Sequence, residues 1–188
     1  MRIGIDIDDV IAETSLSMKD YIEKYDTTGD VSKYIVEIMR GEIPTKPVKD
    51  FLDAYCLSIY KDAKVKAHTS EVLQRLIKAG NEIYMVTSRG EIKYKGSENF
   101  TLEYFKTNNI PYTKILFNSF EKASICKENQ IDVMVDDSAK HCMEIRQAGM
   151  RSILFTSDVN KEIDVPITRV NDWLELEEKL LAIKKEEN

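Results

Sequence analysis

Acidic and hydroxyl side chains follow three short apolar runs of the sequence, at the point where each run ends. These residues are Asp6 and Asp8, Thr87 and Ser88, and Asp136 and Asp137. Carboxylates gathered in one place repel one another and are costly to desolvate, unless a hard cation lies among them. A set of oxygen ligands with two or three carboxylates suits Mg²⁺, whose remaining positions are commonly filled by water and a substrate phosphate. The residue types therefore predict Mg²⁺ and a phosphate group at one site.

The apolar runs that precede these residues have the pattern of buried strands in a parallel sheet. They are short, rich in β-branched residues and nearly continuous in apolar character, as expected where helices cover both faces of a sheet. The predicted strands are Arg2–Ile7, Glu82–Val86, Lys114–Phe117, Ile131–Val135 and Arg151–Thr156. Segments with helical periodicity alternate with most of them, which predicts an α/β fold with a Rossmann-like parallel sheet flanked by helices. Ligands of such sheets bind beyond the carboxyl ends of the strands, where the acidic residues lie.

One segment interrupts this alternation directly after the first strand. Residues 13–66 contain no convincing buried strand, and their pattern predicts helices at Ser15–Lys24, Ser32–Met39 and Val48–Ile59. We therefore expect a core formed by residues 1–12 and 67–188, with residues 13–66 as a helical insertion.

The composition narrows the range of partners and compartments. The 188 residues include 33 acidic and 27 basic ones, and the formal net charge of −6 disfavours binding to a nucleic acid polymer or to a membrane surface. Cys56, Cys126 and Cys142 are widely spaced, which favours neither a disulfide framework nor a zinc site. The sequence shows no signal peptide and no membrane span, so we expect a cytoplasmic protein. Its oligomeric state is not predicted.

The spacing of the first acidic pair suits a shared reacting centre. Residues two apart on a strand project to the same side, so Asp6 and Asp8 can face one group from different depths. A lone Asp-x-Asp is a weak motif, because it is also common in turns and helix caps. Acid pairs at two strand ends make catalysis the stronger interpretation. Asp9, by contrast, is expected to serve as a turn or cap carboxylate.

Taken in chain order, these residues resemble the motifs of a known superfamily. Asp6-Ile7-Asp8, Thr87, a lysine at Lys122 and the pair Asp136-Asp137 are similar to the four motifs of the haloacid dehalogenase-like (HAD) phosphohydrolases. The helical insertion, the stretch 122–137 and the later segment 169–173 resemble bacterial members of the 5′(3′)-deoxyribonucleotidase group. The resemblance implies that residues 13–66 form a small helical cap on a HAD core.

The resemblance also implies roles for the two aspartates of the first motif. Asp6 would be the nucleophile that forms an aspartyl-phosphate. Asp8 would protonate the leaving alkoxide and then deprotonate the attacking water, which requires the pKa of Asp8 to lie above that of Asp6. For the metal, the resemblance implies Asp6, the backbone carbonyl of Asp8 and Asp137, with Asp136 as a supporting or alternative ligand.

Phosphate contacts are implied for the second and third motifs. Thr87 would bind a phosphoryl oxygen through its hydroxyl, helped by the backbone of Ser88. Lys122 and Lys127 compete for the phosphate-binding lysine, and Lys122 is favoured because it lies at the expected start of a helix near the sheet edge. Arg89 could contact a phosphate or base of the substrate, or could merely pair with an acid on the surface, and both interpretations stay open.

We therefore expect a Mg²⁺-dependent phosphomonoesterase that acts on a small phosphorylated metabolite, with a nucleoside monophosphate such as a deoxyribonucleotide as the leading substrate. A sugar phosphate is the alternative substrate. A receiver-like phosphoacceptor domain and a non-catalytic binding module are alternatives from other classes, although the third predicted strand ends in 117–119 without the aspartate that a receiver needs. Several cap aromatics could stack on a nucleobase or could simply pack the cap. These aromatics are Tyr21, Tyr25, Tyr34, Phe51 and Tyr55.

Overall fold

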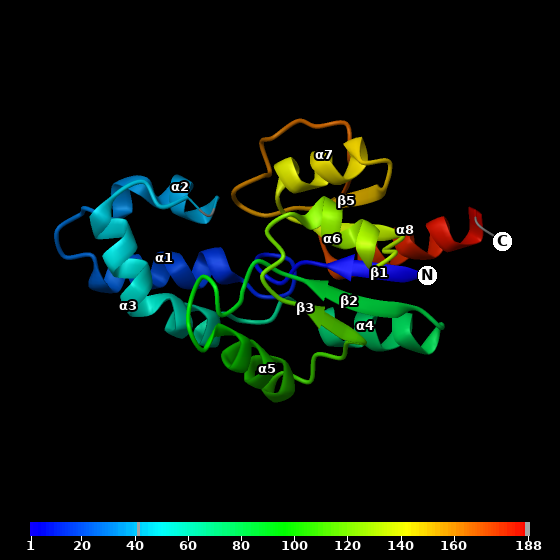
Figure 1. Ribbon diagram of the computed structural model, residues 1–188, viewed down its shortest axis with the longest axis horizontal. Helices are drawn as coiled ribbons and strands as arrows, with labels where there is room; N and C mark the ends of the chain where they lie inside the picture. The colour runs from blue at the N-terminus through cyan, green and yellow to red at the C-terminus, as the bar shows by residue number, and fades with distance from the viewer. Residues whose placement is uncertain (41, 187–188) are drawn as a thin grey trace.

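The computed structural model describes residues 1–40 and 42–186, and it contains a parallel sheet with helices on both faces (Figure 1). The strands are β1 (Arg2–Ile5), β2 (Glu82–Val86), β3 (Lys114–Leu116), β4 (Val133–Asp136), β5 (Arg151–Phe155) and β6 (Thr168–Val170). They lie in the order β3-β2-β1-β4-β5-β6, and each neighbouring pair is parallel. This arrangement confirms the predicted α/β, Rossmann-like fold class.

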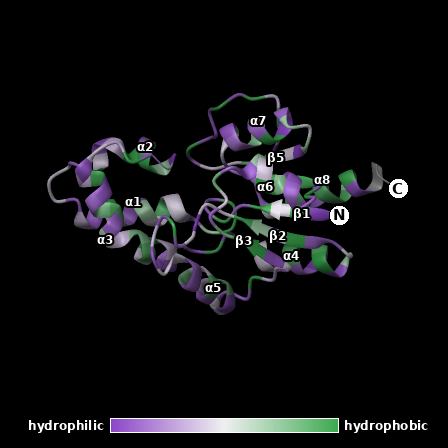
Figure 2. Ribbon diagram, in the orientation of Figure 1, coloured by the Kyte–Doolittle hydropathy of each residue, from purple (hydrophilic) through white to green (hydrophobic). Residues whose placement is uncertain are grey.

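Helices cover the two faces of the sheet unequally. The helices α4 (Thr69–Lys78), α5 (Ser97–Thr107) and α8 (Trp173–Glu186) enclose the larger buried cluster, which contains Ile3, Ile5 and Met85 from the sheet. The helices α6 (Lys122–Glu128) and α7 (Ala139–Gln147) contribute to smaller clusters that include Tyr84, Met134 and Leu154. Many of these helices alternate between hydrophilic and hydrophobic residues, as expected for helices with one buried face (Figure 2). Among the described residues, no helix combines the length and the apolar character needed to cross a membrane.

The central strand β1 lies between β2 and β4, where the strand order changes direction. Ile3 pairs with Ile83 on one side and with Val133 on the other. The strand is shorter than predicted, because it ends at Ile5 rather than Ile7. Asp6 still donates its N–H to the carbonyl of Val135 at 2.9 Å, and beyond it the chain leaves the sheet. The carboxyl ends of β1, β2 and β4 therefore meet at the change in strand order, which is where α/β sheets bind their ligands.

The strand β6 was not predicted, because it is only three residues long and lies at the edge of the sheet. Its sequence, Thr-Arg-Val, has no apolar run, and only Val170 is buried. Short edge strands depend on pairing with a neighbour rather than on their own hydrophobic pattern.

The helical insertion consists of α1 (Thr14–Tyr25), the 3₁₀ helix η1 (Ser32–Tyr34), α2 (Ile35–Met39) and α3 (Lys46–Asp62). These helices lie to one side of the sheet, at the end remote from both termini (Figure 1). They have a buried cluster of their own, whose members include Ile22, Val48 and Ile59. The division of the chain into a core and a cap domain stays a prediction.

The two ends of the insertion are joined at the core. Ala12 forms an antiparallel bridge with Val65, Glu13 donates its N–H to the Lys64 carbonyl at 2.8 Å, and Lys66 donates its N–H to the Ile11 carbonyl at 2.8 Å. The chain therefore leaves the core and returns to it at neighbouring points. This pairing fixes the base of the insertion directly beside the loop that carries Asp6, Asp8 and Asp9.

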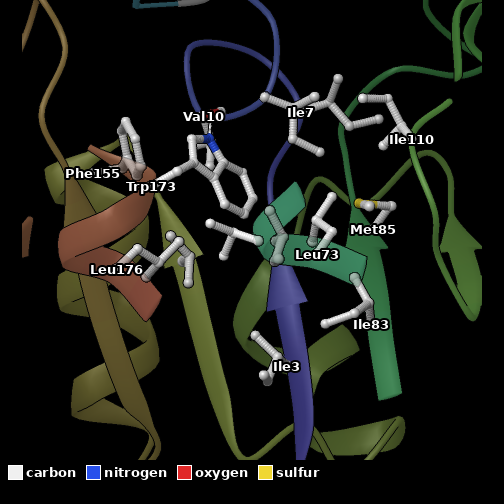
Figure 3. Close-up of a cluster of buried hydrophobic side chains, with 14 of the residues drawn as sticks. Ile3, Ile7, Val10, Leu73, Ile83, Met85, Ile110, Phe155, Trp173 and Leu176 are labelled. Carbon is white, nitrogen blue, oxygen red and sulfur yellow. Dashed lines mark hydrogen bonds between the residues drawn. The ribbon is translucent and has the colours of Figure 1, made fainter. Parts of the chain in front are cut away.

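Trp173, at the start of α8, connects the end of the chain to the same loop. Its ring is buried and lies near Phe155, with the two ring centroids 6.2 Å apart. Its indole Nε1 donates a hydrogen bond of 3.0 Å to the backbone carbonyl of Val10 (Figure 3). One side chain thus fills the core and also satisfies a buried carbonyl of the loop.

Replacing Trp173 should therefore destabilise the protein through two contributions, the lost hydrogen bond to Val10 and the lost packing of the ring. We expect Trp173→Phe to lower the free energy of unfolding by about 1–3 kcal/mol, since it leaves the Val10 carbonyl unsatisfied and removes part of the ring. Trp173→Ala should cost about 3–5 kcal/mol, because it also opens a cavity. Urea unfolding followed by circular dichroism measures both values. The exposed neighbour Leu174 serves as control, and an equal loss for Leu174→Ala would contradict this account.

Candidate active site

A cleft of about 560 Å³ lies between the carboxyl ends of the central strands and the helical insertion. The core side of the cleft is lined by polar residues, among them Asp6, Asp8, Asp9, Ser88, Lys122, Asp136, Asp137, His141 and Asn160. The insertion contributes Thr14, Ser15, Met18, Ile38, Met39, Arg40 and Tyr60. The structure therefore brings the acidic residues of the first and fourth motifs together in one concave site.

Lys122 is the centre of the polar network on the core side. It is the first residue of α6, and its buried ammonium lies 2.9 Å from Oδ1 of Asp6 and 2.6 Å from Oδ2 of Asp136. The other oxygen of Asp136 accepts the N–H of Ser138 at 2.8 Å. Lys127, the competing lysine of the sequence analysis, lies exposed further along the same helix. The geometry therefore favours Lys122 as the lysine of this site.

Three carboxylates form a cluster that could hold a cation. One oxygen from each of Asp6, Asp136 and Asp137 lies within 4.8 Å of the others. Oδ2 of Asp137 accepts a hydrogen bond of 3.3 Å from the hydroxyl of Ser157, and the backbone carbonyl of Asp137 accepts one of 2.7 Å from Nδ2 of Asn160. An all-oxygen set of this kind, partly buried and rich in charge, suits a hard divalent cation.

The pKa values of the cluster reflect its crowding. Burial raises the pKa of Asp6 to about 7, with further raising from Asp136 and Asp8 and partial relief from Lys122. Burial, together with the charges of Asp136, Asp9 and Asp6, holds the pKa of Asp137 well above its usual range. Burial also acts to raise the pKa of Asp136, but Lys122 and His141 outweigh it and lower this pKa to about 2. A single ammonium therefore does not balance the three carboxylates, and a divalent cation would favour their ionised forms.

Asp8 has a different set of partners. Its Oδ1 accepts hydrogen bonds of 2.6 Å from Nη2 of Arg89 and 2.6 Å from the hydroxyl of Thr14. Burial acts to raise the pKa of Asp8, but the charge and hydrogen bonds of Arg89 and the hydroxyl of Thr14 outweigh it and lower this pKa. The two aspartates of the first motif therefore belong to separate ion pairs.

The order of these two pKa values is the reverse of the order that the sequence analysis requires for a general acid at position 8. The pKa of Asp6 is raised, whereas that of Asp8 is lowered. The sequence could not reveal this order, because it depends on Arg89, which is distant in the chain and was left with two open roles. The structure pairs the buried Arg89 with Asp8, which lines the cleft and is not the surface acid that the sequence suggested, and Arg89 is not itself among the residues that line the cleft.

The two hydroxyl residues after β2 lie in different positions. Ser88 lines the cleft, whereas Thr87 is fully buried and its Oγ1 accepts the N–H of Arg89 at 3.1 Å. Gly90 follows, and a Cβ at this position would come within 2.1 Å of the Asn118 side chain, so only glycine fits this close approach. The structure thus fixes the turn that carries Thr87 and Ser88 against the loop after β3.

Asp9 lies near the cluster but serves α1. It has a positive φ of 55°, and its carboxylate accepts hydrogen bonds from the N–H and the hydroxyl of Ser15, in the first turn of α1. A residue with a short polar side chain tolerates such a backbone conformation. These contacts agree with the turn or cap function expected for Asp9 from the sequence.

The aromatic residues of the insertion mainly contact one another. Tyr25 stacks on Tyr55 at 4.6 Å between ring centroids, and Tyr21 and Phe51 pack against the same ring of Tyr55. The five aromatics named in the sequence analysis are not among the residues that line the cleft. Packing of the insertion is therefore the role that the structure assigns to this group.

Several residues of the cleft escaped the sequence analysis. Tyr60 and Thr14 approach from the insertion, and Asn160 from the loop after β5. His141 also lines the cleft, with its Nδ1 3.5 Å from Oδ2 of Asp136. None of them belongs to a recognisable short pattern, so only the folded chain brings them to the acidic residues.

Comparison with known proteins identifies a family and agrees with the fold. A family model described as "5' nucleotidase, deoxy (Pyrimidine), cytosolic type C protein" matches residues 1–186. No curated protein matches the chain significantly.

Several solved structures share the fold at low sequence identity. A predicted phosphatase from Clostridium acetobutylicum is 15% identical, with a TM-score of 0.66, and the match covers 96% of this chain and 98% of that one. CbbY from Rhodobacter sphaeroides, in complex with phosphate, is 14% identical with a TM-score of 0.64, over 93% and 95% of the two chains. A haloacid dehalogenase-like hydrolase from Streptococcus pneumoniae is 12% identical with a TM-score of 0.63, over 97% of each chain.

The family match spans almost the entire sequence, including the strand ends that carry the four motifs. It favours a hydrolase over a receiver-like phosphoacceptor or a non-catalytic binding module. The chain belongs to the cytosolic type C family of deoxy-5′ nucleotidases, and it is a phosphomonoester hydrolase.

Proposed function

We propose that the protein is a Mg²⁺-dependent phosphomonoesterase that forms an aspartyl-phosphate on Asp6 and acts on a nucleoside monophosphate such as a deoxyribonucleotide. The observation that carries the proposal is the buried contact of 2.9 Å between Asp6 and Lys122, beside Asp136 and Asp137 at one sheet edge. A nucleophile, a cation and a group of metal-binding oxygens are thereby assembled where α/β sheets bind their ligands.

In the first step, an oxygen of Asp6 attacks phosphorus, and the bond between phosphorus and the ester oxygen breaks. The leaving alkoxide receives a proton from Asp8, which lines the same cleft. Lys122, with the hydroxyl and backbone groups of Thr87 and Ser88, would neutralise and hold the phosphoryl oxygens. Since Thr87 is fully buried, its contribution requires a small local movement or acts through the turn that it supports.

In the second step, water attacks phosphorus, the bond to Asp6 breaks and inorganic phosphate leaves. Asp8 takes the proton from this water, and its lowered pKa keeps the carboxylate ionised before the transfer, although it also makes Asp8 a weaker base. The first step needs the protonated form of the same group. The proton that Asp8 takes from water in this step is the one that it donates to the leaving group of the next cycle, and the lowered pKa makes Asp8 a stronger acid in that first step.

The cluster of Asp6, Asp136 and Asp137 fits a divalent cation. The three groups supply only oxygen ligands, and the raised pKa values of Asp6 and Asp137 reflect a surplus of negative charge around them. When bound, Mg²⁺ would neutralise charge on the phosphoryl oxygens and keep Asp6 ionised for attack. The proposed direct ligands are carboxylate oxygens of Asp6 and Asp137 and the backbone carbonyl oxygen of Asp8. Asp136 is proposed as a supporting or alternative ligand.

A nucleotide suits the dimensions and the lining of the cleft. Met18, Ile38 and Met39 from the insertion form an apolar part of the wall opposite the acidic cluster. A volume of about 560 Å³ is within the range of small-molecule sites, and an apolar wall suits the face of a base. We propose that residues 13–66 act as a cap that recognises the part of the substrate remote from the phosphate.

A sugar phosphate is the second candidate substrate. A variant of CbbY from Rhodobacter sphaeroides, with a TM-score of 0.64 and 14% identity to this chain, was solved in complex with xylulose-1,5-bisphosphate. The same core mechanism would serve a sugar phosphate, because the acidic cluster acts only on the phosphate group. The rest of the substrate would contact the wall that the insertion forms.

Removal of the nucleophile should abolish turnover. We expect Asp6→Asn to lower the kcat for an aryl phosphate ester by at least about 10³-fold, because the amide cannot form the phosphoenzyme. Asp20→Asn, which changes an exposed acid of α1, is the matched control and should retain normal kcat. Normal turnover by Asp6→Asn would exclude Asp6 as the nucleophile.

Activity should require a divalent cation. Excess EDTA is expected to remove turnover, and added Mg²⁺ should restore it. Asp137→Asn should raise the Mg²⁺ concentration needed for half-maximal activity by more than about tenfold, since the loss of even a supporting group often costs that much. Full activity of the wild-type protein in excess EDTA would contradict the metal assignment.

The substrate class can be tested by comparing phosphorylated metabolites at fixed Mg²⁺. We expect the highest kcat/KM for deoxynucleoside monophosphates, in a panel that includes 5′ and 3′ isomers and sugar phosphates of similar size. A higher kcat/KM for the sugar phosphates would reject the nucleotidase assignment but leave the core mechanism intact.

A further inference from the structure

Arg89 is one of the largest fully buried side chains of the protein, although it carries a charge. Its residue is 1% exposed, and its side chain lies between the core and the helical insertion. Burial of a guanidinium is costly unless the charge is paired and the donors are used. The contacts that compensate this buried charge therefore indicate what Arg89 does.

The guanidinium contacts both oxygens of the Asp8 carboxyl group, but unequally. Nη2 donates to Oδ1 at 2.6 Å, while Nε lies 3.2 Å from each of the two oxygens. The hydroxyl of Thr14 donates to the same Oδ1 at 2.6 Å. Oδ1 is thus held by two short hydrogen bonds, whereas Oδ2 has only the longer contact with Nε. This arrangement fixes the rotation of the carboxyl group and leaves Oδ2 as the oxygen with capacity for a proton.

Arg89 is itself held from both sides. Its Cζ lies 3.9 Å from the centroid of the Tyr60 ring, on α3, which is the close geometry of a cation–π contact. Its backbone N–H donates to Oγ1 of Thr87, at the end of β2. Nη1 is buried and has no hydrogen-bond partner among the described residues. The fixed part of the side chain is therefore the edge that faces Asp8.

We propose that Arg89 is a positioning residue, which fixes the carboxyl group of Asp8 through Oδ1 so that Oδ2 meets the ester oxygen of the substrate. The inference rests on the proposed function, in which Asp8 transfers the proton. Because Tyr60 and Thr14 belong to the insertion, the orientation of Asp8 is coupled to the placement of α1 and α3. A lysine could supply the charge but not the planar pair of donors.

The alternative is that Arg89 binds the substrate directly. A substrate-binding arginine should line the cleft, but Arg89 does not, whereas Asp8, Lys122 and Tyr60 do. Its nearest charged partner is Asp8, and the side chain has no exposed surface. The two roles also differ in their kinetic effect. Loss of a substrate contact weakens all substrates alike, whereas loss of a positioned acid affects those whose leaving groups need a proton.

The test compares kcat/KM for phenyl, 4-nitrophenyl and 2,4-dinitrophenyl phosphate at saturating Mg²⁺. This parameter reports the step in which the ester bond breaks, and the leaving phenolates need protonation less and less along the series. We expect Arg89→Met to lower kcat/KM for phenyl phosphate by about 10²-fold, the lower end of general-acid catalysis, and for 2,4-dinitrophenyl phosphate by less than about fivefold. Arg89→Lys should give an intermediate slope.

Two further variants keep the test decisive. Asp8→Asn should show the same dependence on the leaving group with a larger loss of kcat/KM. Thr14→Val should show the same dependence with a smaller loss of kcat/KM, and it removes no buried charge. If Arg89→Met does not fold, as judged by circular dichroism, Arg89→Lys and Thr14→Val carry the test. Lys106→Met, at an exposed site on α5, is the control with unchanged kinetics.

The outcomes separate this inference from the proposed function. An equal loss on all three esters in the Arg89 variants, or a gain on phenyl phosphate, would overturn the positioning role while Asp8→Asn keeps its dependence on the leaving group. If Asp8→Asn shows no such dependence, or if the wild-type protein hydrolyses none of the esters, the proposed mechanism itself fails.

Discussion

Three carboxylates within 4.8 Å of one another, from Asp6, Asp136 and Asp137, impose the main physical constraint on this protein. Parallel strands bring them together, because β1 and β4 are neighbours and both point towards the same edge of the sheet. Burial makes each of these charges costly, so the surrounding chain has to supply compensation. Lys122 at the start of α6 provides one positive charge, and the loop after β5 provides Asn160, whose amide fixes the backbone of Asp137. The negative charge that Lys122 leaves uncompensated is the physical reason to expect a bound divalent cation.

The same crowding explains why the two aspartates of the first motif form ion pairs with different cations. If Asp8 shared Lys122 with Asp6, one ammonium would face four carboxylates. Arg89 avoids this by forming a second ion pair with Asp8, at 2.6 Å, on the side of the insertion. Each carboxylate therefore has a cation of its own, which suits the proposed reaction, where one carboxylate attacks phosphorus while the other exchanges a proton. Buried pairs of this kind also define orientation, because a displaced partner would leave a charge without compensation.

Much of this architecture could be predicted from the sequence, and the failures have physical causes. Continuous apolar runs predicted the strands β1 to β5, and the order of the motif residues predicted which strand ends meet. The edge strand β6 was missed because its stability comes from pairing with β5 rather than from an apolar pattern. The partner of Arg89 and the lowered pKa of Asp8 depend on contacts between distant segments, which spacing cannot reveal. The aromatic residues of the insertion illustrate the same limit, since composition alone does not distinguish a ring that binds a base from the stacked pair Tyr25 and Tyr55.

The net charge of −6 poses a final question, because an acidic protein that hydrolyses phosphate esters must attract anions. Lys122 and Arg89 do not answer it at long range, since both are buried and neutralised by their aspartates. The exposed cations that line the cleft, Arg40, Lys93 and Lys140, are better placed, because they lie on three different elements around the same opening. Exposed charges act over roughly 8–10 Å at physiological ionic strength, which is sufficient to guide an anion into the cleft. Attraction and chemistry are thus divided between two sets of cations, so that the buried set can hold Asp6 and Asp8 in place and, through Lys122, neutralise the bound phosphoryl group.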